Sequence, residues 1–183
     1  MPPILLLAGS PASGKSTLAH LLAQRSPKGM HIPVDSLRIM VIGGVVHPGP
    51  VWSPELTEQL ELARRTAVDT ALRYRKAGFL VAIDDFWDPH SKLREYDELD
   101  STTDFFRVLL KPPMDIALTR LRERQPHSEM RDHMEDGIRL TYADIEAQTS
   151  LVVEQNWYVV DTSTDTIDKC ADRIMTLTER SIS

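Results

Sequence analysis

The sequence of 183 residues has one cysteine, few aromatic residues (6%) and no long run of apolar side chains. One cysteine cannot form an intramolecular disulfide, which excludes a small scaffold held together by disulfides. A transmembrane helix needs about 20 consecutive apolar residues, and no run approaches that length. Because Cys170 falls within an amphipathic pattern, we expect it to be a small core residue rather than a nucleophile.

Negative charge exceeds positive charge. The chain has 21 Lys and Arg against 27 Asp and Glu, which gives a formal net charge of −6. General nucleic-acid binding draws on clustered cations, so nucleic acid is not the expected partner, although a local basic cleft remains compatible. No basic leader precedes the apolar run that starts at Pro3, which favours a cytoplasmic location, and no membrane association is expected. The length predicts one domain spanning residues 1–183.

The most informative stretch follows the first apolar run. Residues 4–8 are typical of a short buried strand, and Leu18, Leu21 and Leu22 fall on one face of a helix. The sequence between them satisfies every position of G-x-x-x-x-G-K-[ST], the phosphate-binding loop. It reads Gly9, Ser10, Pro11, Ala12, Ser13, Gly14, Lys15, Ser16, Thr17. The order of strand, glycine-rich turn and helix is the one that the motif requires, which a chance match in a turn would not explain.

Each part of this loop has an expected role in binding a nucleotide. Backbone N–H groups of residues 13–16 would surround a phosphate at the helix N-terminus, where the helix dipole also favours an anion. We expect Lys15 to reach the β- and γ-phosphates and the Ser16 hydroxyl to hold Mg²⁺. The expected cofactors are therefore ATP and Mg²⁺.

Apolar and helical segments alternate along the rest of the chain. Strands are expected at residues 31–35, 79–83, 105–110 and 157–161, and Pro33 suits an edge strand. Helices are expected at residues 54–76 with a cap at Ser53, from Pro112, at 136–150 and near the C-terminus. Residues 120–139 are densely charged and poor in large aliphatic side chains, which indicates a solvated, mobile segment. The alternation predicts an α/β fold with a mainly parallel sheet covered on both faces.

Several carboxylates lie at the carboxyl ends of the expected strands. Asp35 and Asp161 end two of these strands, and the pair Asp84-Asp85 directly follows a third. In parallel sheets ligands bind beyond the carboxyl ends of the strands, so these residues should gather at one edge with the phosphate-binding loop. Either Asp84 or Asp85 is expected to bind Mg²⁺, directly or through water, and the sequence does not distinguish them. The alternative is a pair of solvated loop acids.

Asp35 is the candidate general base, because a carboxylate at that strand end can accept the proton of a substrate hydroxyl. Arg38, one helical turn later, can contact the substrate or the transferred phosphoryl group. Asp35 can also be the N-cap of a short helix over residues 36–40, and the two roles are compatible.

Arg120 and Arg124 are spaced i, i+4 and share one helix face. We expect them to belong to a lid, residues 120–139, that closes over ATP and supplies positive charge for binding and catalysis. The alternative is a solvated helix face. Further lid candidates are His127, Arg131 and His133.

Four segments together resemble the P-loop kinases related to chloramphenicol phosphotransferase, over most of the chain. They are residues 9–17, Val34-Asp35-Ser36-Leu37, Ile83-Asp84-Asp85-Phe86 and Val160-Asp161-Thr162. The spacings Asp35-x-x-Arg38 and Arg120-Leu121-x-x-Arg124 are more similar to those of phage-type polynucleotide kinases and zeta toxins. The resemblance implies a three-layer P-loop NTPase fold with a five-stranded parallel sheet of order 2-3-1-4-5. It also implies transfer of the γ-phosphate of ATP to a hydroxyl, with Asp35 as general base.

The expected acceptor is a small organic compound that is antibiotic-like, sugar-like or nucleoside-like. The apolar loop at residues 41–52 has no recognisable acceptor motif, and it can either line a pocket or pack on the core. The candidate pocket walls are Val45, Val46, Trp52 and Trp87. Two alternatives remain. A polynucleotide 5′-hydroxyl kinase would need a basic groove around Arg38, Arg64 and Arg65, and a non-catalytic nucleotide-binding switch would tolerate the loss of Asp35.

Overall fold

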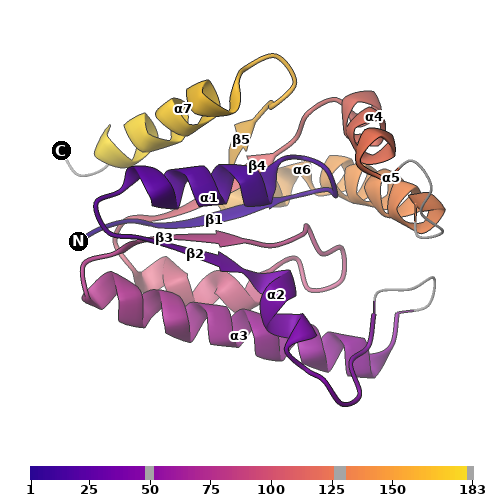
Figure 1. Cartoon of the computed structure of the whole chain (residues 1–183), viewed down its shortest axis with the longest axis horizontal. Helices are drawn as coiled ribbons and strands as arrows, with labels where there is room; N and C mark the ends of the chain where they lie inside the picture. Colours follow the sequence, from indigo (N-terminus) through magenta and orange to yellow (C-terminus); the bar gives the residue numbers. More distant parts are fainter. Residues whose placement is uncertain (48–51, 126–130, 181–183) are drawn as a thin grey trace.

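The computed structural model describes residues 1–47, 52–125 and 131–180, and its centre is a five-stranded parallel sheet (Figure 1). The strand order is β2-β3-β1-β4-β5. The strands are β1 (Ile4–Gly9), β2 (Gly29–Pro33), β3 (Leu80–Asp84), β4 (Phe105–Leu110) and β5 (Tyr158–Val160). The predicted fold class and strand order are confirmed, and β2 is an edge strand as Pro33 indicated.

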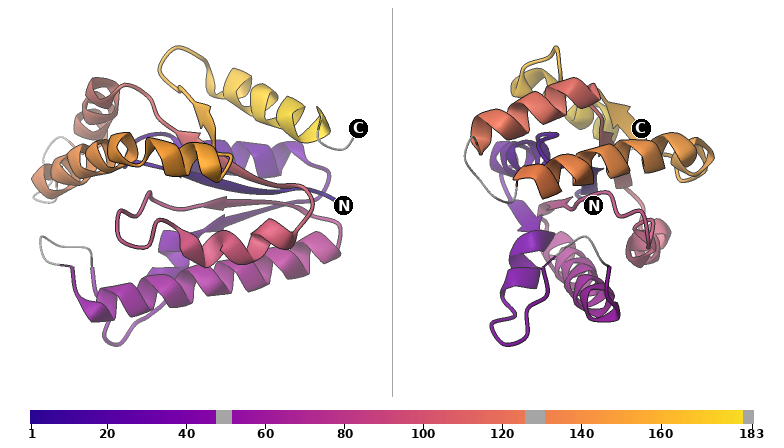
Figure 2. Two further views of the ribbon diagram at one scale, coloured as in Figure 1. Left: turned by 180° about the vertical axis from the view of Figure 1, so that it is seen from behind. Right: turned by 90° about the vertical axis from the view of Figure 1, so that its right-hand side faces the viewer.

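Helices cover both faces of this sheet (Figures 1 and 2). One face carries α1 (Lys15–Arg25) and α7 (Ile167–Arg180), and the other carries α3 (Pro54–Lys76) and the 3₁₀ helix η1 (Arg94–Ser101). The remaining helices are α2 (Val34–Ile39), α4 (Met114–Arg124), α5 (Arg131–Ala147) and α6 (Thr149–Glu154). Among the described residues, no helix combines the length and apolar character needed to cross a bilayer.

The core has two layers, one on each face of the sheet, and strand β1 contributes side chains to both. Successive side chains of a strand point to opposite faces, so Ile4, Leu6 and Ala8 pack with α3 while Leu5 and Leu7 pack with α1 and α7. All five are fully buried, which explains why the sequence shows a continuous apolar run here rather than alternation. Cys170 lies in the α1 and α7 layer and is buried, as its pattern predicted.

The end of β2 differs from the prediction. The strand stops at Pro33, which becomes the N-cap of α2, and Asp35 lies in the first turn of that helix. The expected strand to Asp35 is therefore two residues too long, and Asp35 is not the N-cap. Proline has no N–H and suits the residue where pairing stops and a helix begins.

The prediction that residues 120–139 form a solvated segment outside any core is also corrected. Its described residues are mostly helical, with α4 ending at Arg124 and α5 starting at Arg131, five residues before the predicted start. The two helices share a small core of their own in which Leu121 and Ile138 are buried. Beside that core Arg122 donates two hydrogen bonds of 2.8 Å to the buried Glu135. These hydrogen bonds, together with those from Arg139, lower the pKa of Glu135 to about 2.

Ser53 caps the N-terminus of α3. The Ser53 hydroxyl accepts a 3.1 Å hydrogen bond from the backbone N–H of Leu56, as its predicted capping role requires. We expect Ser53→Ala to lower the free energy of unfolding by about 1 kcal/mol, because a helix N–H loses its partner. Urea denaturation measures this, and Ser53→Asp, which preserves a capping oxygen, is the matched control. Equal losses in the two variants would contradict the capping role.

Candidate active site

The phosphate-binding loop connects β1 to α1 at the carboxyl edge of the sheet (Figure 1). Gly14 precedes α1 with φ 100°, a conformation that favours glycine. A Cβ on Gly9 would lie 2.5 Å from the carbonyl oxygen of Leu110, so this position too requires glycine. Within the described part of the chain no side chain caps the first turn of α1. Its free N–H groups therefore suit an anion such as a phosphate.

Lys15 is folded back across this loop. Its Nζ donates a 2.9 Å hydrogen bond to the carbonyl oxygen of Ser10. Burial lowers the pKa of Lys15, while the nearby carboxylates of Asp84, Asp35 and Asp85 oppose the shift. The ammonium thus lies within electrostatic reach of three acids and is bound to a carbonyl oxygen of the loop.

The two adjacent aspartates at the end of β3 contact different partners. Asp84 faces the loop, where its Oδ1 accepts a 3.0 Å hydrogen bond from Ser16 Oγ, and its Oδ2 lies 2.5 Å from His31 Nε2. Asp85 faces α3, and its Oδ2 accepts a 2.7 Å hydrogen bond from Arg64. Burial raises the pKa of Asp85, an effect that Arg64 opposes. The hydroxyl of Ser16 and the carboxylate of Asp84 are hard oxygen donors and fit Mg²⁺, which prefers such ligands together with phosphate oxygens.

Asp35 and Arg38 lie on the same side of α2, but their exposure differs. The Asp35 side chain is 71% exposed, whereas Arg38 is buried and lies 3.7 Å from the Asp35 carboxylate. Arg38 donates a 2.8 Å hydrogen bond to the carbonyl oxygen of Val46. It therefore holds the loop after α2 in place, a role that the sequence did not reveal. Gln59 of α3 holds the same loop through Val46 and Gly44.

The predicted lid arginines occupy different environments. Arg120 donates hydrogen bonds to the side chain and the carbonyl oxygen of Thr162, at 3.1 and 2.6 Å. Thr162 in turn donates to the carbonyl oxygen of Ser13, at 2.9 Å, so Arg120 is connected to the phosphate-binding loop through one residue. Arg124 is exposed and close enough to lower the pKa of Lys15. Of the other lid candidates, His127 lies outside the described residues.

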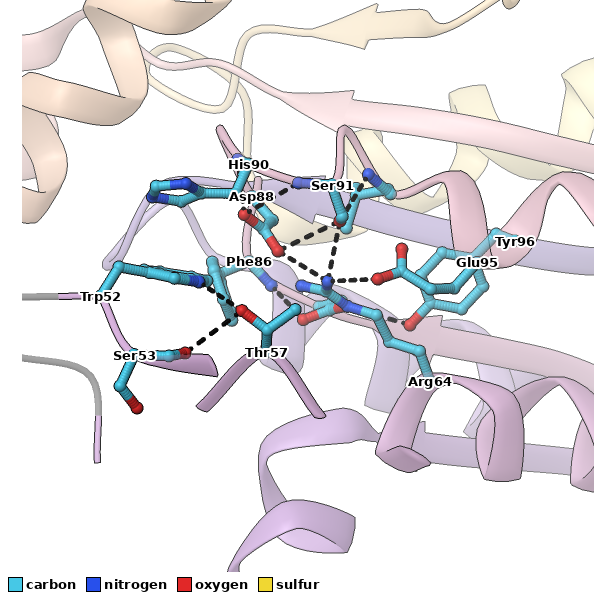
Figure 3. Close-up of polar contacts among 12 residues, drawn as sticks. Trp52, Ser53, Thr57, Arg64, Phe86, Asp88, His90, Ser91, Glu95 and Tyr96 are labelled. Atoms are coloured by element: carbon cyan, nitrogen blue, oxygen red, sulfur yellow. Dashed lines mark hydrogen bonds and ion pairs between the residues drawn. The ribbon is translucent and has the colours of Figure 1, made fainter. Parts of the chain in front are cut away.

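A buried ionic cluster lies beside the site, on the side of α3. Arg64 is fully buried and binds three carboxylates, those of Asp85, Asp88 and Glu95, at 2.7, 2.7 and 3.0 Å (Figure 3). Ser91 and Tyr96 complete this set, which we call the Arg64 cluster. The basic groove at Arg38, Arg64 and Arg65 that a polynucleotide kinase would need is not formed, because the first two side chains are buried and only Arg65 is exposed. The sequence around Leu60 shows that an arginine follows one helical turn later. It does not show the three carboxylates that bind this arginine, because they are distant in the sequence.

The predicted pocket walls are only partly brought together. Trp52 stacks on His90, with ring centroids 4.1 Å apart, and both line a cavity of about 250 Å³ bounded by the Arg64 cluster (Figure 3). Trp87 is fully buried and donates to Asp144, so ordinary packing explains it. A larger cavity of about 820 Å³, lined by Phe105, Arg107 and Trp157 among others, includes none of the predicted site residues.

Comparisons with known proteins agree with this fold. Shikimate kinase from Bacteroides thetaiotaomicron is 16% identical, with a TM-score of 0.63 over 97% of this chain and 98% of that one. A gluconokinase from Sinorhizobium meliloti is 14% identical, with a TM-score of 0.65 over 98% and 93%. At these identities the likeness shows the fold alone. No curated protein matches the chain. The family model described as chloramphenicol phosphotransferase-like protein matches residues 3–179, and the chain therefore belongs to the chloramphenicol phosphotransferase-like family of P-loop kinases.

Proposed function

We propose that the protein transfers the γ-phosphoryl group of ATP, with Mg²⁺, to a hydroxyl of a small organic acceptor. The observation that carries this proposal is the hydrogen bond between Ser16 of the phosphate-binding loop and Asp84 at the end of β3. It joins the two oxygen ligands that a phosphate-bound Mg²⁺ needs, next to the Lys15 ammonium. Family membership supports the same class of reaction.

Each residue of the site has its own role in the proposed reaction. The amides of residues 13–16 and Lys15 hold the phosphates, and Ser16 with Asp84 holds the metal ion. Asp35 accepts the proton of the acceptor hydroxyl as its oxygen forms a bond to the γ-phosphorus, while the bond to the β-phosphate oxygen breaks and ADP leaves. Arg120 and Arg124 supply positive charge toward the transferring group. Asp85 is assigned no metal role, because Arg64 and Tyr96 occupy one carboxylate oxygen and the backbone N–H of Phe86 occupies the other.

The test is ATP consumption by the purified protein with Mg²⁺ and a panel of hydroxyl compounds. The panel contains phenicols, aminoglycosides, nucleosides, sugars and 5′-hydroxyl oligonucleotides. We expect turnover with at least one small molecule and none without Mg²⁺. Turnover confined to oligonucleotides would make the protein a polynucleotide kinase, and its rate should then fall steeply with salt. Tight ATP binding with no turnover on any acceptor would favour a nucleotide-binding switch.

A further inference from the structure

His31 of β2 contacts the carboxylate that the proposed function assigns to Mg²⁺. Its Nε2 lies 2.5 Å from Oδ2 of Asp84, while Oδ1 of the same carboxylate accepts the 3.0 Å hydrogen bond from Ser16 Oγ. A carboxylate accepts hydrogen bonds and does not donate them, so the hydrogen of this contact is on His31 Nε2. The two oxygens of Asp84 thus have separate partners, and Oδ1 is the one joined to the phosphate-binding loop.

The sheet register brings His31 and Asp84 together. Strands β2 and β3 are parallel neighbours, with His31 opposite Ala82 and Pro33 opposite Asp84 (Figure 1). Residues two apart on a strand point to the same face, so His31, Ala82 and Asp84 all project toward the face that α1 covers. Because Ala82 has only a methyl group, the imidazole has room to reach the next residue pair along the strands.

The imidazole is also contacted from the helix side. His20 of α1 packs edge-on against the His31 ring, with centroids 6.0 Å apart and an interplanar angle of 73°. The side chains of His31 and Asp84 are 19% and 9% exposed, so little water reaches the contact between them. A hydrogen bond in such a surrounding is electrostatically stronger than one in water. The orientation of the Asp84 carboxylate is therefore set from both β2 and the phosphate-binding loop.

Lys15 is the group that would compete for Asp84. Among the carboxylates that oppose the lowering of the Lys15 pKa by burial, Asp84 has the largest effect. The ammonium nevertheless donates its hydrogen bond to the carbonyl oxygen of Ser10. Because His31 occupies Oδ2 of Asp84, that oxygen is less available to the ammonium, which leaves the Lys15 charge for phosphate oxygens.

We propose that His31 is a positioning residue for the metal site: its Nε2–H holds Oδ2 of Asp84, so that Oδ1 stays toward Ser16, the other residue assigned to Mg²⁺. Hydrogen bonds of this kind orient a metal ligand, and their loss commonly changes metal affinity by about 10-fold to 100-fold. The inference rests on the proposed function for the metal role of Asp84. In the sequence His31 is only the first residue of an expected strand.

The experiment measures nucleotide binding with and without the metal ion, which requires no acceptor. AMP-PNP, an ATP analogue with a non-hydrolysable β–γ link, is titrated by calorimetry into the protein with Mg²⁺ and again with EDTA in its place. His31→Leu removes the hydrogen bond and keeps a side chain of similar size. We expect its affinity for AMP-PNP to fall about 10-fold with Mg²⁺ and to stay near the wild-type value with EDTA. A structural defect in the phosphate-binding loop would lower both affinities.

Two further variants separate the hydrogen bond from packing. His31→Gln places an amide N–H near the position of Nε2 and should restore most of the affinity measured with Mg²⁺. His20→Leu is the matched control, because His20 contacts the His31 ring but, among the described residues, donates no hydrogen bond to Asp84. It should bind AMP-PNP as the wild type does under both conditions. His31→Ala, which also lacks the donor, replaces His31→Leu if circular dichroism shows that the leucine variant is unfolded.

Three results would overturn the inference. They are an affinity of His31→Leu with Mg²⁺ that equals or exceeds that of the wild type, equal losses with Mg²⁺ and with EDTA, and a loss in His31→Gln as large as in His31→Leu. A wild-type affinity that does not depend on Mg²⁺ would overturn both the inference and the metal role of Asp84. The reaction is judged separately: a Mg²⁺-dependent loss in His31→Leu, with no ATP consumption on any acceptor, would retain the role of His31 and remove the proposed kinase reaction.

Discussion

Asp35→Asn is expected to reduce turnover by a factor on the order of 10²–10⁴ while leaving ATP affinity nearly unchanged. The amide has the size of the carboxylate but cannot accept the proton of the acceptor hydroxyl. Asp35 is largely exposed, and its only charged contact within hydrogen-bonding or ion-pair range among the described residues is Arg38 at 3.7 Å, so the substitution should not disturb the phosphate-binding loop. Steady-state kinetics on the acceptor found in the panel, together with ATP titration, measures both effects.

The matched control for this variant is Asp69→Asn, which changes an exposed carboxylate on α3 outside the proposed site. Its turnover should equal that of the wild type. Wild-type turnover in Asp35→Asn would remove Asp35 from the mechanism. A parallel loss of ATP affinity in Asp35→Asn would show that it acts on nucleotide binding instead of on the acceptor.

Arg64→Met is expected to lower the free energy of unfolding by about 3–5 kcal/mol, because it leaves buried carboxylates without their cation. For a chain of this size that corresponds to a fall in Tm of roughly 6–20 °C. Arg65→Met is the matched control, since Arg65 is the next residue of α3 and is exposed. Its free energy of unfolding should change by less than about 0.5 kcal/mol, as for most surface substitutions. Urea denaturation of both variants at pH 7 provides the comparison.

The deficit of Arg64→Met should also depend on pH. Burial by itself would raise the pKa of Asp88, but Arg64 and the hydrogen bonds around it lower the pKa below the usual value. A carboxyl group whose pKa is lower in the folded state stabilises the protein above its unfolded pKa of about 3.9, and this contribution is lost as the pH falls through the folded value. We therefore expect the difference between wild type and variant to shrink from pH 7 to pH 3.5. A deficit that is equal at both pH values would contradict an electrostatic origin.

Local sequence was sufficient for the parts of the fold that depend on neighbours in the chain. Three predictions of this kind are correct: the strand at residues 4–8, the cap at Ser53 and the strand at residues 105–110. Each depends on a hydrophobic pattern or a capping side chain within a few residues of sequence. The helices from Pro112 and at residues 136–150 were predicted as well, but not their packing on each other around Leu121 and Ile138. That small core is assembled from two separate segments, which a local pattern cannot pair.

The sequence by itself determined the phosphate-binding loop, the α/β fold and the set of acids at the ends of the strands. Only the tertiary structure decided which groups those acids contact. Asp84 and Asp85 are adjacent and chemically identical, but successive side chains leave a strand in opposite directions, so one meets Ser16 and the other meets Arg64. Arg64, which the composition counts as a cation, is likewise a buried partner of three acids that lie 21 to 31 residues away in the sequence, because the chain fold packs α3 against the segment that carries them.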